Sequence, residues 1–168
     1  MTQEFPLVEK VKQIYSQIEA NALKTEELRM APPENMALLK EIGYTRAFQP
    51  KKFGGTESSL REFCEATALL AGACCGTTWG AQLLNTHQHQ VALFSEQAQN
   101  DVWGEDPLAT ASSSIAPFGK SDEVAGGVNF SGDMTWSSAC DHADWAICGF
   151  LRKGKHSFAL IPRVDYEI

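Results

Sequence analysis

Two short runs of the sequence combine hydroxyl side chains with aromatic ones. Residues 111–119 read Ala-Ser-Ser-Ser-Ile-Ala-Pro-Phe-Gly, and residues 136–145 read Trp-Ser-Ser-Ala-Cys-Asp-His-Ala-Asp-Trp. Hydroxyl groups donate and accept hydrogen bonds without carrying charge, and aromatic rings provide flat apolar surfaces. This combination suits a polar, planar ligand better than it suits a hydrophobic core. The residues alone leave a second interpretation open, in which Trp136 simply anchors a β domain.

A histidine on an apolar helix face is the third candidate for chemistry. His87 shares helical spacing with Trp79, Leu83 and Val91 in the segment after Gly76. A histidine in such a position is by default buried and bonded to a backbone carbonyl. Imidazole also titrates near neutral pH, so it could act as an acid or base toward a ligand such as a phenol. The sequence pattern leaves both interpretations open.

Two other chemistries fit the residue types but not their spacing. Residues two apart on a helix point about 200° apart, so His87 and His89 cannot face one zinc ion. A hydrolase triad of Ser113, His87 and Asp141 lacks the Gly-x-Ser-x-Gly turn that presents a nucleophilic serine. The serines have an ordinary alternative as hydroxyls that satisfy local backbone groups. No metal site and no triad are therefore expected.

The composition indicates a globular protein of one domain, or of one domain and part of another. The chain has 168 residues, is 43% hydrophobic and 21% charged, and carries a formal net charge of −7. This charge, without a dense cluster of Lys and Arg, argues against nucleic-acid binding. No apolar run approaches the roughly 20 residues of a membrane span, and the N-terminus lacks signal-peptide character. Five cysteines without scaffold spacing predict a reducing, cytoplasmic compartment.

Helical periodicity dominates the first two-thirds of the chain. Ser59-x-x-Glu62 is a capping box, in which each side chain bonds the backbone N–H of the other residue, and Ser95 is expected to cap a further helix. Proline near a first turn and glycine after a last turn mark other helix ends. The helices are expected over residues 7–18, 33–42, 59–73 and 76–94, and in a short segment after residue 95.

Beyond Pro107 the pattern changes to short strands. They are expected over residues 108–114, 123–130, 145–151 and 156–161. Turn residues around Pro117-Phe118-Gly119 are expected to separate the first two strands, and residues 152–155 are expected to form a hairpin turn. The predicted fold class is α+β, with a helical domain over 1–106 followed by the start of a β domain over 107–168. So few strands would leave open sheet edges.

The chain resembles the oxygenase component of two-component p-hydroxyphenylacetate 3-hydroxylases, which are flavin-dependent monooxygenases of the acyl-CoA dehydrogenase fold. Related steroid-ring hydroxylases share the serine run, but Thr-His-Gln-His-Gln at residues 86–90 favours the phenylacetate group. The resemblance runs along essentially the whole chain and rests on residues 47–51, 54–55, 70–74, 86–90, 109–119, 136–143 and 161–163.

This resemblance implies an enzyme that hydroxylates a phenol, such as p-hydroxyphenylacetate, ortho to its hydroxyl through a C4a-hydroperoxyflavin. A separate flavin reductase would supply the reduced flavin, usually FMNH₂ with FADH₂ as the alternative, and O₂ would be the oxidant. His87 and Ser113 would contact the phenolic oxygen, and Ser138 would bond the flavin near N5 and slow the loss of hydrogen peroxide. The residues expected to line the flavin are Trp79, Ser113, Ser114, Ile115, Trp136, Ser137 and Ser138.

The resemblance also implies that the chain is an N-terminal fragment. The remaining β strands and a C-terminal four-helix bundle, which builds a homotetramer in this family, would lie beyond Ile168, and the fragment alone would have little activity. Ala139 stands where these relatives usually have glycine. The sequence leaves two alternatives open: a flavin oxidoreductase of the acyl-CoA dehydrogenase type, and a non-catalytic helical interaction module.

Overall fold

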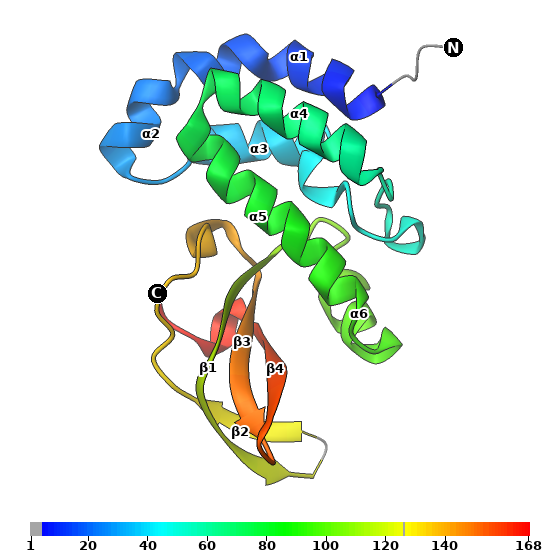
Figure 1. Cartoon of the computed structure of the whole chain (residues 1–168), viewed down its shortest axis with the longest axis vertical. Coiled ribbons are helices and arrows are strands. Elements are labelled where there is room, and N and C mark those ends of the chain that lie inside the picture. The colour runs from blue at the N-terminus through cyan, green and yellow to red at the C-terminus, as the bar shows by residue number, and fades with distance from the viewer. Residues whose placement is uncertain (1–4, 126) are drawn as a thin grey trace.

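The computed structural model describes residues 5–125 and 127–168, and it places a bundle of helices above a curved sheet (Figure 1). The helices of the described residues are α1 (Pro6–Ala20), α2 (Ala22–Leu28), α3 (Pro33–Glu41), α4 (Leu60–Ala73), α5 (Cys75–Ala92) and α6 (Glu96–Trp103). One-turn 3₁₀ helices lie at η1 (Tyr44–Arg46), η2 (Lys51–Phe53), η3 (Cys140–His142) and η4 (Arg163–Asp165). The prediction of helices followed by strands is confirmed. No helix among these residues is long and apolar enough to cross a membrane.

The helical part is held together by one apolar face on each helix. In α1, residues at helical spacing from Leu7 to Ile18 are buried, and they pack against Phe63 and Leu70 of α4. Figure 1 shows α1 and α4 side by side. Burial of such a face, rather than the intrinsic propensity of short helices, supplies most of their stability.

The capping box predicted at the start of α4 is half confirmed. The Ser59 Oγ accepts a hydrogen bond from the Glu62 backbone N–H at 3.1 Å, as expected of an N-cap serine. The Glu62 carboxylate, however, does not bond the Ser59 N–H. Its Oε1 accepts a hydrogen bond from the Leu7 N–H at 2.9 Å, in the first turn of α1. One carboxylate therefore satisfies an unpaired helix N–H on a neighbouring helix and ties α1 to α4.

The sheet of the described residues contains β1 (Ala111–Val124), β2 (Gly127–Ser131), β3 (Trp145–Arg152) and β4 (Lys155–Pro162). Their order is β2-β1-β3-β4, with β1 and β3 parallel and the other two pairs antiparallel. The hairpin prediction is confirmed, because Lys153 and Gly154 connect β3 to β4 with φ of 51° and 76°. Two consecutive residues with positive φ are the signature of a type I′ turn.

The predicted turn at Pro117-Phe118-Gly119 is wrong. The strand predicted over residues 123–130 is right for residues 127–130, which lie in β2, but residues 123 and 124 belong to β1, and residue 126 lies outside the described residues. The strand β1 continues through the predicted turn to Val124, and β2 begins only at Gly127. The register of β1 against β3 shifts between Ser114 and Gly119, so Pro117 lies in an irregular stretch where its missing N–H breaks no regular ladder. A Cβ on Gly149 of β3 would lie 2.2 Å from the Ile115 carbonyl oxygen, so this close approach requires glycine.

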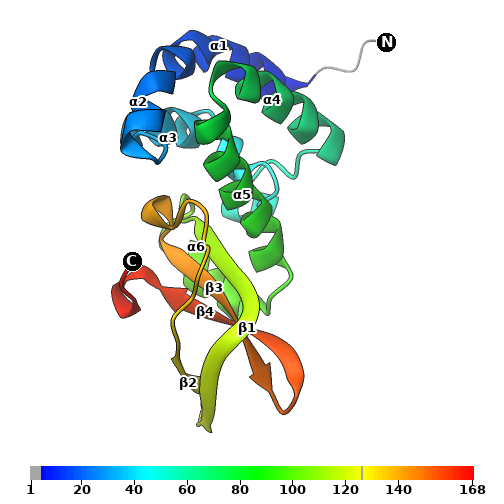
Figure 2. The ribbon, with the colours of Figure 1, turned by 60° about the vertical axis from the view of Figure 1, so that its left-hand side comes forward.

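The sheet meets the helices through one of its two faces (Figure 2). On that face Ala111 and Ile147 pack in an apolar cluster with Val91 and Trp103. Alternate residues of the strands, among them Ser112, point to the opposite face, which borders a cavity of about 980 Å³. The first part of β1 therefore presents one row of side chains to α5 and another row to the cavity.

We expect Glu62→Ala to lower the free energy of unfolding by about 1–2 kcal/mol, because it leaves the Leu7 N–H without its charged acceptor. Glu65→Ala is the matched control on the same helix. Glu65 makes only an exposed ion pair with Arg61 at 4.0 Å, so its removal should cost less than about 0.5 kcal/mol. Urea unfolding followed by circular dichroism measures both effects, and equal losses in the two variants would contradict this account.

Candidate functional site

His87 and Ser113 form a hydrogen-bonded pair where α5 meets β1. The His87 Nδ1 lies 2.9 Å from the carbonyl oxygen of Ala111, and its Nε2 lies 2.8 Å from the Ser113 Oγ. A carbonyl oxygen only accepts, so Nδ1 carries the proton of the neutral ring and Nε2 accepts the Ser113 hydroxyl proton. The backbone of β1 therefore selects the tautomer that turns the basic nitrogen toward Ser113.

His87 is buried, and its burial disfavours the imidazolium form. Desolvation lowers the pKa of His87 below its ordinary value, and the hydrogen bond to Ala111 opposes this effect only in part. The ring is therefore neutral at neutral pH and available as a proton acceptor. His89, two residues further on, is exposed and its ring lies edge-on to Phe48, which confirms that the two histidines diverge.

A second contact joins α5 to the loop between β2 and β3. The indole Nε1 of Trp79 donates a hydrogen bond to the Ser138 Oγ at 3.2 Å. Trp79 and His87 are eight residues apart on α5, so they lie on the same side of the helix about 12 Å apart along its axis. The Ser138 hydroxyl accepts from the indole and keeps its own proton to donate elsewhere.

The loop that carries Ser138 has an unusual backbone. Trp136 and Ala139 adopt φ of 62° and 61°, in the left-handed region that residues with a Cβ seldom enter. The Trp136 side chain is 94% exposed. The Ser114 Oγ donates to the Thr135 carbonyl oxygen at 2.9 Å and so fixes the start of this turn to β1. Strained backbone conformations cluster at ligand-binding and active sites, so this loop is a candidate for ligand contact.

The end of the same loop is fixed by Thr110 and Asp144. The Asp144 Oδ2 accepts from the Thr110 backbone N–H at 2.8 Å and lies 3.1 Å from the Thr110 Oγ1. The Thr110 Oγ1 also lies 3.0 Å from the His142 carbonyl oxygen. These contacts were not predicted from the sequence, although the polar Asp-His-Ala-Asp run after Cys140 was a signal that this loop is hydrogen-bonded.

The residues predicted to line one ligand are brought together only in part. The structure pairs His87 with Ser113 and Trp79 with Ser138, and it leaves the Ile115 side chain exposed. Consecutive strand residues point to opposite faces, so Ser114 turns away from His87. Together with Trp136 and Ser137 it lines the cavity on the other side of the sheet.

The donor set of this region fits a neutral polar ring system rather than a metal. Among the described residues no three His, Cys, Asp or Glu side chains converge on a point where an ion could bind. The uncharged groups form two pairs, the Ser113 hydroxyl with the neutral His87 and the Ser138 hydroxyl with the exposed indole of Trp79, and the exposed ring of Trp136 lies in the same loop as Ser138. Flat apolar surfaces beside uncharged hydrogen-bonding groups suit an isoalloxazine ring, and Ser138 retains a proton to donate to it.

The fold is the acyl-CoA dehydrogenase-type fold of flavin monooxygenases, as predicted. The crystal structure of 3-HSA hydroxylase from Rhodococcus sp. RHA1 matches it with a TM-score of 0.90 and 37% sequence identity, over 96% of this chain and 43% of that one. XiaF from Streptomyces sp., solved in complex with FADH₂ and glycerol, shares the fold with a TM-score of 0.87 at 24% identity, over 95% of this chain and 42% of that one.

Sequence comparison also confirms the predicted resemblance. The oxygenase component of p-hydroxyphenylacetate 3-hydroxylase from Acinetobacter baumannii is 56% identical over 167 residues, which are 96% of this chain and 40% of that protein. The oxygenase component of FADH₂-dependent resorcinol hydroxylase from Rhizobium sp. is 36% identical over 168 residues, 96% of this chain and 41% of that protein. The chain thus spans about 40% of the length of these curated relatives. No protein-family model matches it.

The lowered pKa of His87 makes stability depend on pH. As the pH falls through the ordinary histidine pKa of 6.5, the unfolded chain takes up a proton first. The stability that neutral His87 contributes is therefore complete above that pH and is lost below it. Urea unfolding at pH values of about 7.5 and about 5.5 measures this loss. Between the two pH values, the free energy of unfolding should fall less in His87→Gln than in the parent. His89→Gln, at the exposed neighbour, should behave as the parent does, and the same loss in all three proteins would refute the assignment.

Ala139→Gly should stabilise the protein, because glycine adopts a φ of 61° without steric cost. A left-handed alanine costs roughly 1–2 kcal/mol, and the greater freedom of glycine in the unfolded chain offsets about 0.4–1 kcal/mol of the gain. We expect the free energy of unfolding to rise by about 0.5–1 kcal/mol. Ala143→Gly is the control: Ala143 is buried with φ of −97°, so its variant should be less stable than the parent. Denaturant unfolding of both variants tests whether the free energy of unfolding rises in Ala139→Gly and falls in Ala143→Gly.

Proposed function

We propose that this chain forms the flavin- and phenol-facing part of a reduced-flavin-dependent aromatic monooxygenase. The observation that carries the proposal is the buried His87–Ser113 pair, whose tautomer is set by the Ala111 carbonyl. It occurs in a chain 56% identical to a protein named p-hydroxyphenylacetate 3-hydroxylase, oxygenase component. The proposed substrate is a phenol, p-hydroxyphenylacetate or a close analogue, which is hydroxylated ortho to its hydroxyl.

The pair is arranged to remove a proton from a phenol. The Ser113 hydroxyl donates to the His87 Nε2, which leaves the lone pairs of Oγ free to accept a phenolic proton. As that proton passes to Oγ, the serine proton passes to Nε2. Burial opposes the imidazolium, so the transfer is favoured only when the negative charge of a phenolate forms beside it. The phenolate ring is the stronger nucleophile at the carbon ortho to oxygen, which is where hydroxylation would occur.

The proposed flavin contacts are Ser138 with the indoles of Trp79 and Trp136, together with Ser113, Ser114, Ile115 and Ser137. When bound, the reduced flavin supplies the activation of O₂ and the transfer of one oxygen atom. Ser138 would donate its free proton to the flavin, because it already accepts from Trp79. Neutral hydroxyls beside the flavin can hydrogen-bond to oxygen atoms without giving up a proton. Oxygen activated at the flavin would therefore be protected from premature release as hydrogen peroxide.

The remaining parts of the proposal concern the whole protein. We infer that the cofactor is FMNH₂, with FADH₂ as the alternative, and that a separate reductase delivers it. We also infer that the whole protein assembles as a homotetramer. A cytoplasmic location agrees with the five cysteines, all free within the described residues. The proposed domain boundary lies at residues 106–107, between the end of α6 at Trp103 and the start of β1 at Ala111. On this view the chain by itself binds flavin weakly.

A chimaera tests the proposal, with the sequence after residue 168 taken from the Acinetobacter baumannii relative. It is mixed with FMNH₂ without oxygen, oxygen is then added with or without p-hydroxyphenylacetate, and the catechol and hydrogen peroxide are quantified. We expect catechol from the parent, and about 100-fold slower formation in His87→Ala, since a positioned acid or base contributes at least that factor. His89→Ala, which alters the exposed neighbour, should retain the parent rate.

Two results would contradict the proposal. Hydrogen peroxide without catechol, whatever phenol is added, would return attention to a dehydrogenase or a non-catalytic module. Equal rates in the His87→Ala and His89→Ala chimaeras would remove His87 from the chemistry while leaving the monooxygenase intact.

A further inference from the structure

The loop that carries Ser138 is docked on the helical part along its length. Besides the Trp79–Ser138 hydrogen bond, the backbone of α5 approaches Ala139 so closely that a Cβ on Gly80 would lie 3.2 Å from the Ala139 Cβ. Ala143 is buried in the apolar cluster of the helices. The loop therefore belongs to the packing of the helical part, although it connects two strands of the sheet.

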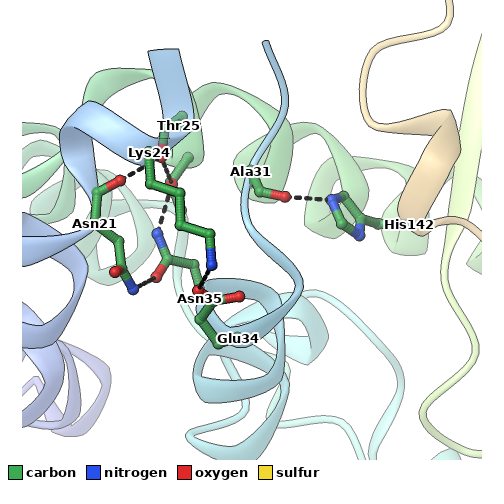
Figure 3. Close-up of polar contacts among 8 residues, drawn as sticks. Asn21, Lys24, Thr25, Ala31, Glu34, Asn35 and His142 are labelled. Carbon is green, nitrogen blue, oxygen red and sulfur yellow. Dashed lines mark hydrogen bonds and ion pairs between the residues drawn. The ribbon is translucent and has the colours of Figure 1, made fainter. Parts of the chain in front are cut away.

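Among the hydrogen bonds of the described residues, the one made by His142 joins the positions furthest apart in the sequence. Its Nε2 lies 2.7 Å from the carbonyl oxygen of Ala31, which is 111 residues away in the sequence. Figure 3 shows the imidazole of His142 pointing at this carbonyl, in the connection between α2 and α3. A carbonyl oxygen only accepts, so Nε2 is the donor. The contact does not serve the proposed proton transfer.

The Ala31 carbonyl is a firm point of attachment because buried polar side chains fix the segments around it. Asn35, at the start of α3, accepts from the Asn21 Nδ2 at 2.8 Å and donates to the Thr77 Oγ1 at 3.0 Å. The Thr25 Oγ1 donates to the Asn21 carbonyl oxygen at 3.0 Å and lies 3.3 Å from the Thr77 Oγ1. Most of this cluster, with the Lys24–Glu34 ion pair on its exposed side, is drawn in Figure 3.

The same cluster also orients the first turn of α5, which contains Thr77. Trp79 follows two residues later and holds Ser138. The hydrogen-bonded cluster therefore links the two segments to which the loop is attached, the first turns of α5 and the connection between α2 and α3. Buried polar networks in which the side chains satisfy one another hold a single geometry, since any displacement exposes unpaired groups.

We propose that His142 is a positioning residue, whose hydrogen bond to Ala31 holds the loop of residues 136–143 and thereby the Ser138 hydroxyl in place. That this loop faces the flavin rests on the proposed function; the anchoring itself does not. The backbone of residue 142 has a separate restraint, because the Thr110 Oγ1 bonds its carbonyl oxygen. Loss of the imidazole contact should therefore loosen the loop without unfolding the sheet or the helices.

Hydrogen exchange of the 168-residue chain, without flavin, tests the proposal. His142→Phe keeps a ring of similar size but removes the donor, whereas His142→Gln keeps an N–H that can reach the carbonyl. We expect amides of residues 137–143 to exchange faster in His142→Phe by a factor between about 2 and about 12, the range that one net hydrogen bond provides. Exchange in α1 and α4 should stay at the parent rate, and His142→Gln should restore most of the loop protection.

Tyr44→Phe is the control, because it removes one hydrogen bond of an aromatic ring elsewhere, from the buried Tyr44 hydroxyl to the Thr67 Oγ1 at 2.7 Å in the helical core. It should leave the loop amides at the parent rate. The proposal is overturned if His142→Phe fails to fold, if it speeds exchange equally in α1 and in the loop, or if His142→Gln exchanges like His142→Phe. Because no flavin is present, none of these outcomes depends on the proposed enzymatic activity.

Discussion

The contact between α5 and the beginning of β1 is the interaction on which the rest of the structure depends. The Gln88 Nε2 donates to the Ala109 carbonyl oxygen at 2.9 Å, and the His87 Nδ1 bonds that of Ala111 at the same distance. Both carbonyls are buried, so each would carry a desolvation penalty without its side-chain donor. Val91, one turn further along, closes the junction with apolar packing against Ile147. This joint fixes where the sheet lies relative to the helices, and with it the separation of the two serine sites.

The site built on this joint uses no ionised side chain. Ser113, Ser138 and the neutral His87 are paired with one another, with Trp79 or with the backbone. In a buried site an ionised side chain would need its own partner, whereas these groups are satisfied while neutral and can still exchange a proton. These neutral groups can therefore accept a proton, through Ser113 and His87, when a bound phenol becomes negatively charged.

Two of the five non-glycine residues with positive φ in the described part of the chain lie in the loop that the helices hold. The left-handed conformations at Trp136 and Ala139 are maintained by contacts from three directions: β1 through Ser114, α5 through Trp79, and the connection between α2 and α3 through His142. Strained residues persist only where surrounding structure over-determines them. The loop's shape is thus a property of the assembled molecule, and the exposed Trp136 ring is presented by that shape.

Local features of the sequence determined the elements of the fold. Helical spacing of apolar residues, the Ser59 and Ser95 caps and the Lys153-Gly154 turn act over a few residues, so they could be recognised without any partner. The divergence of His87 and His89 followed from helix geometry alone. The resemblance to flavin monooxygenases pointed to the region around His87, Ser113 and Ser138, and the structure brings His87 to Ser113 in a direct hydrogen bond.

Tertiary structure decided the features that depend on a partner distant in sequence. The strand β1 passes through Pro117 because β3, with Gly149, accommodates the shift in register there, and nothing local to Pro117 reports that pairing. The tautomer of His87 is set by a backbone carbonyl, and every residue type carries one. The same holds for the bond from His142 to Ala31 across 111 residues. A backbone acceptor leaves no trace in the sequence, so only the folded chain shows which side chain it receives.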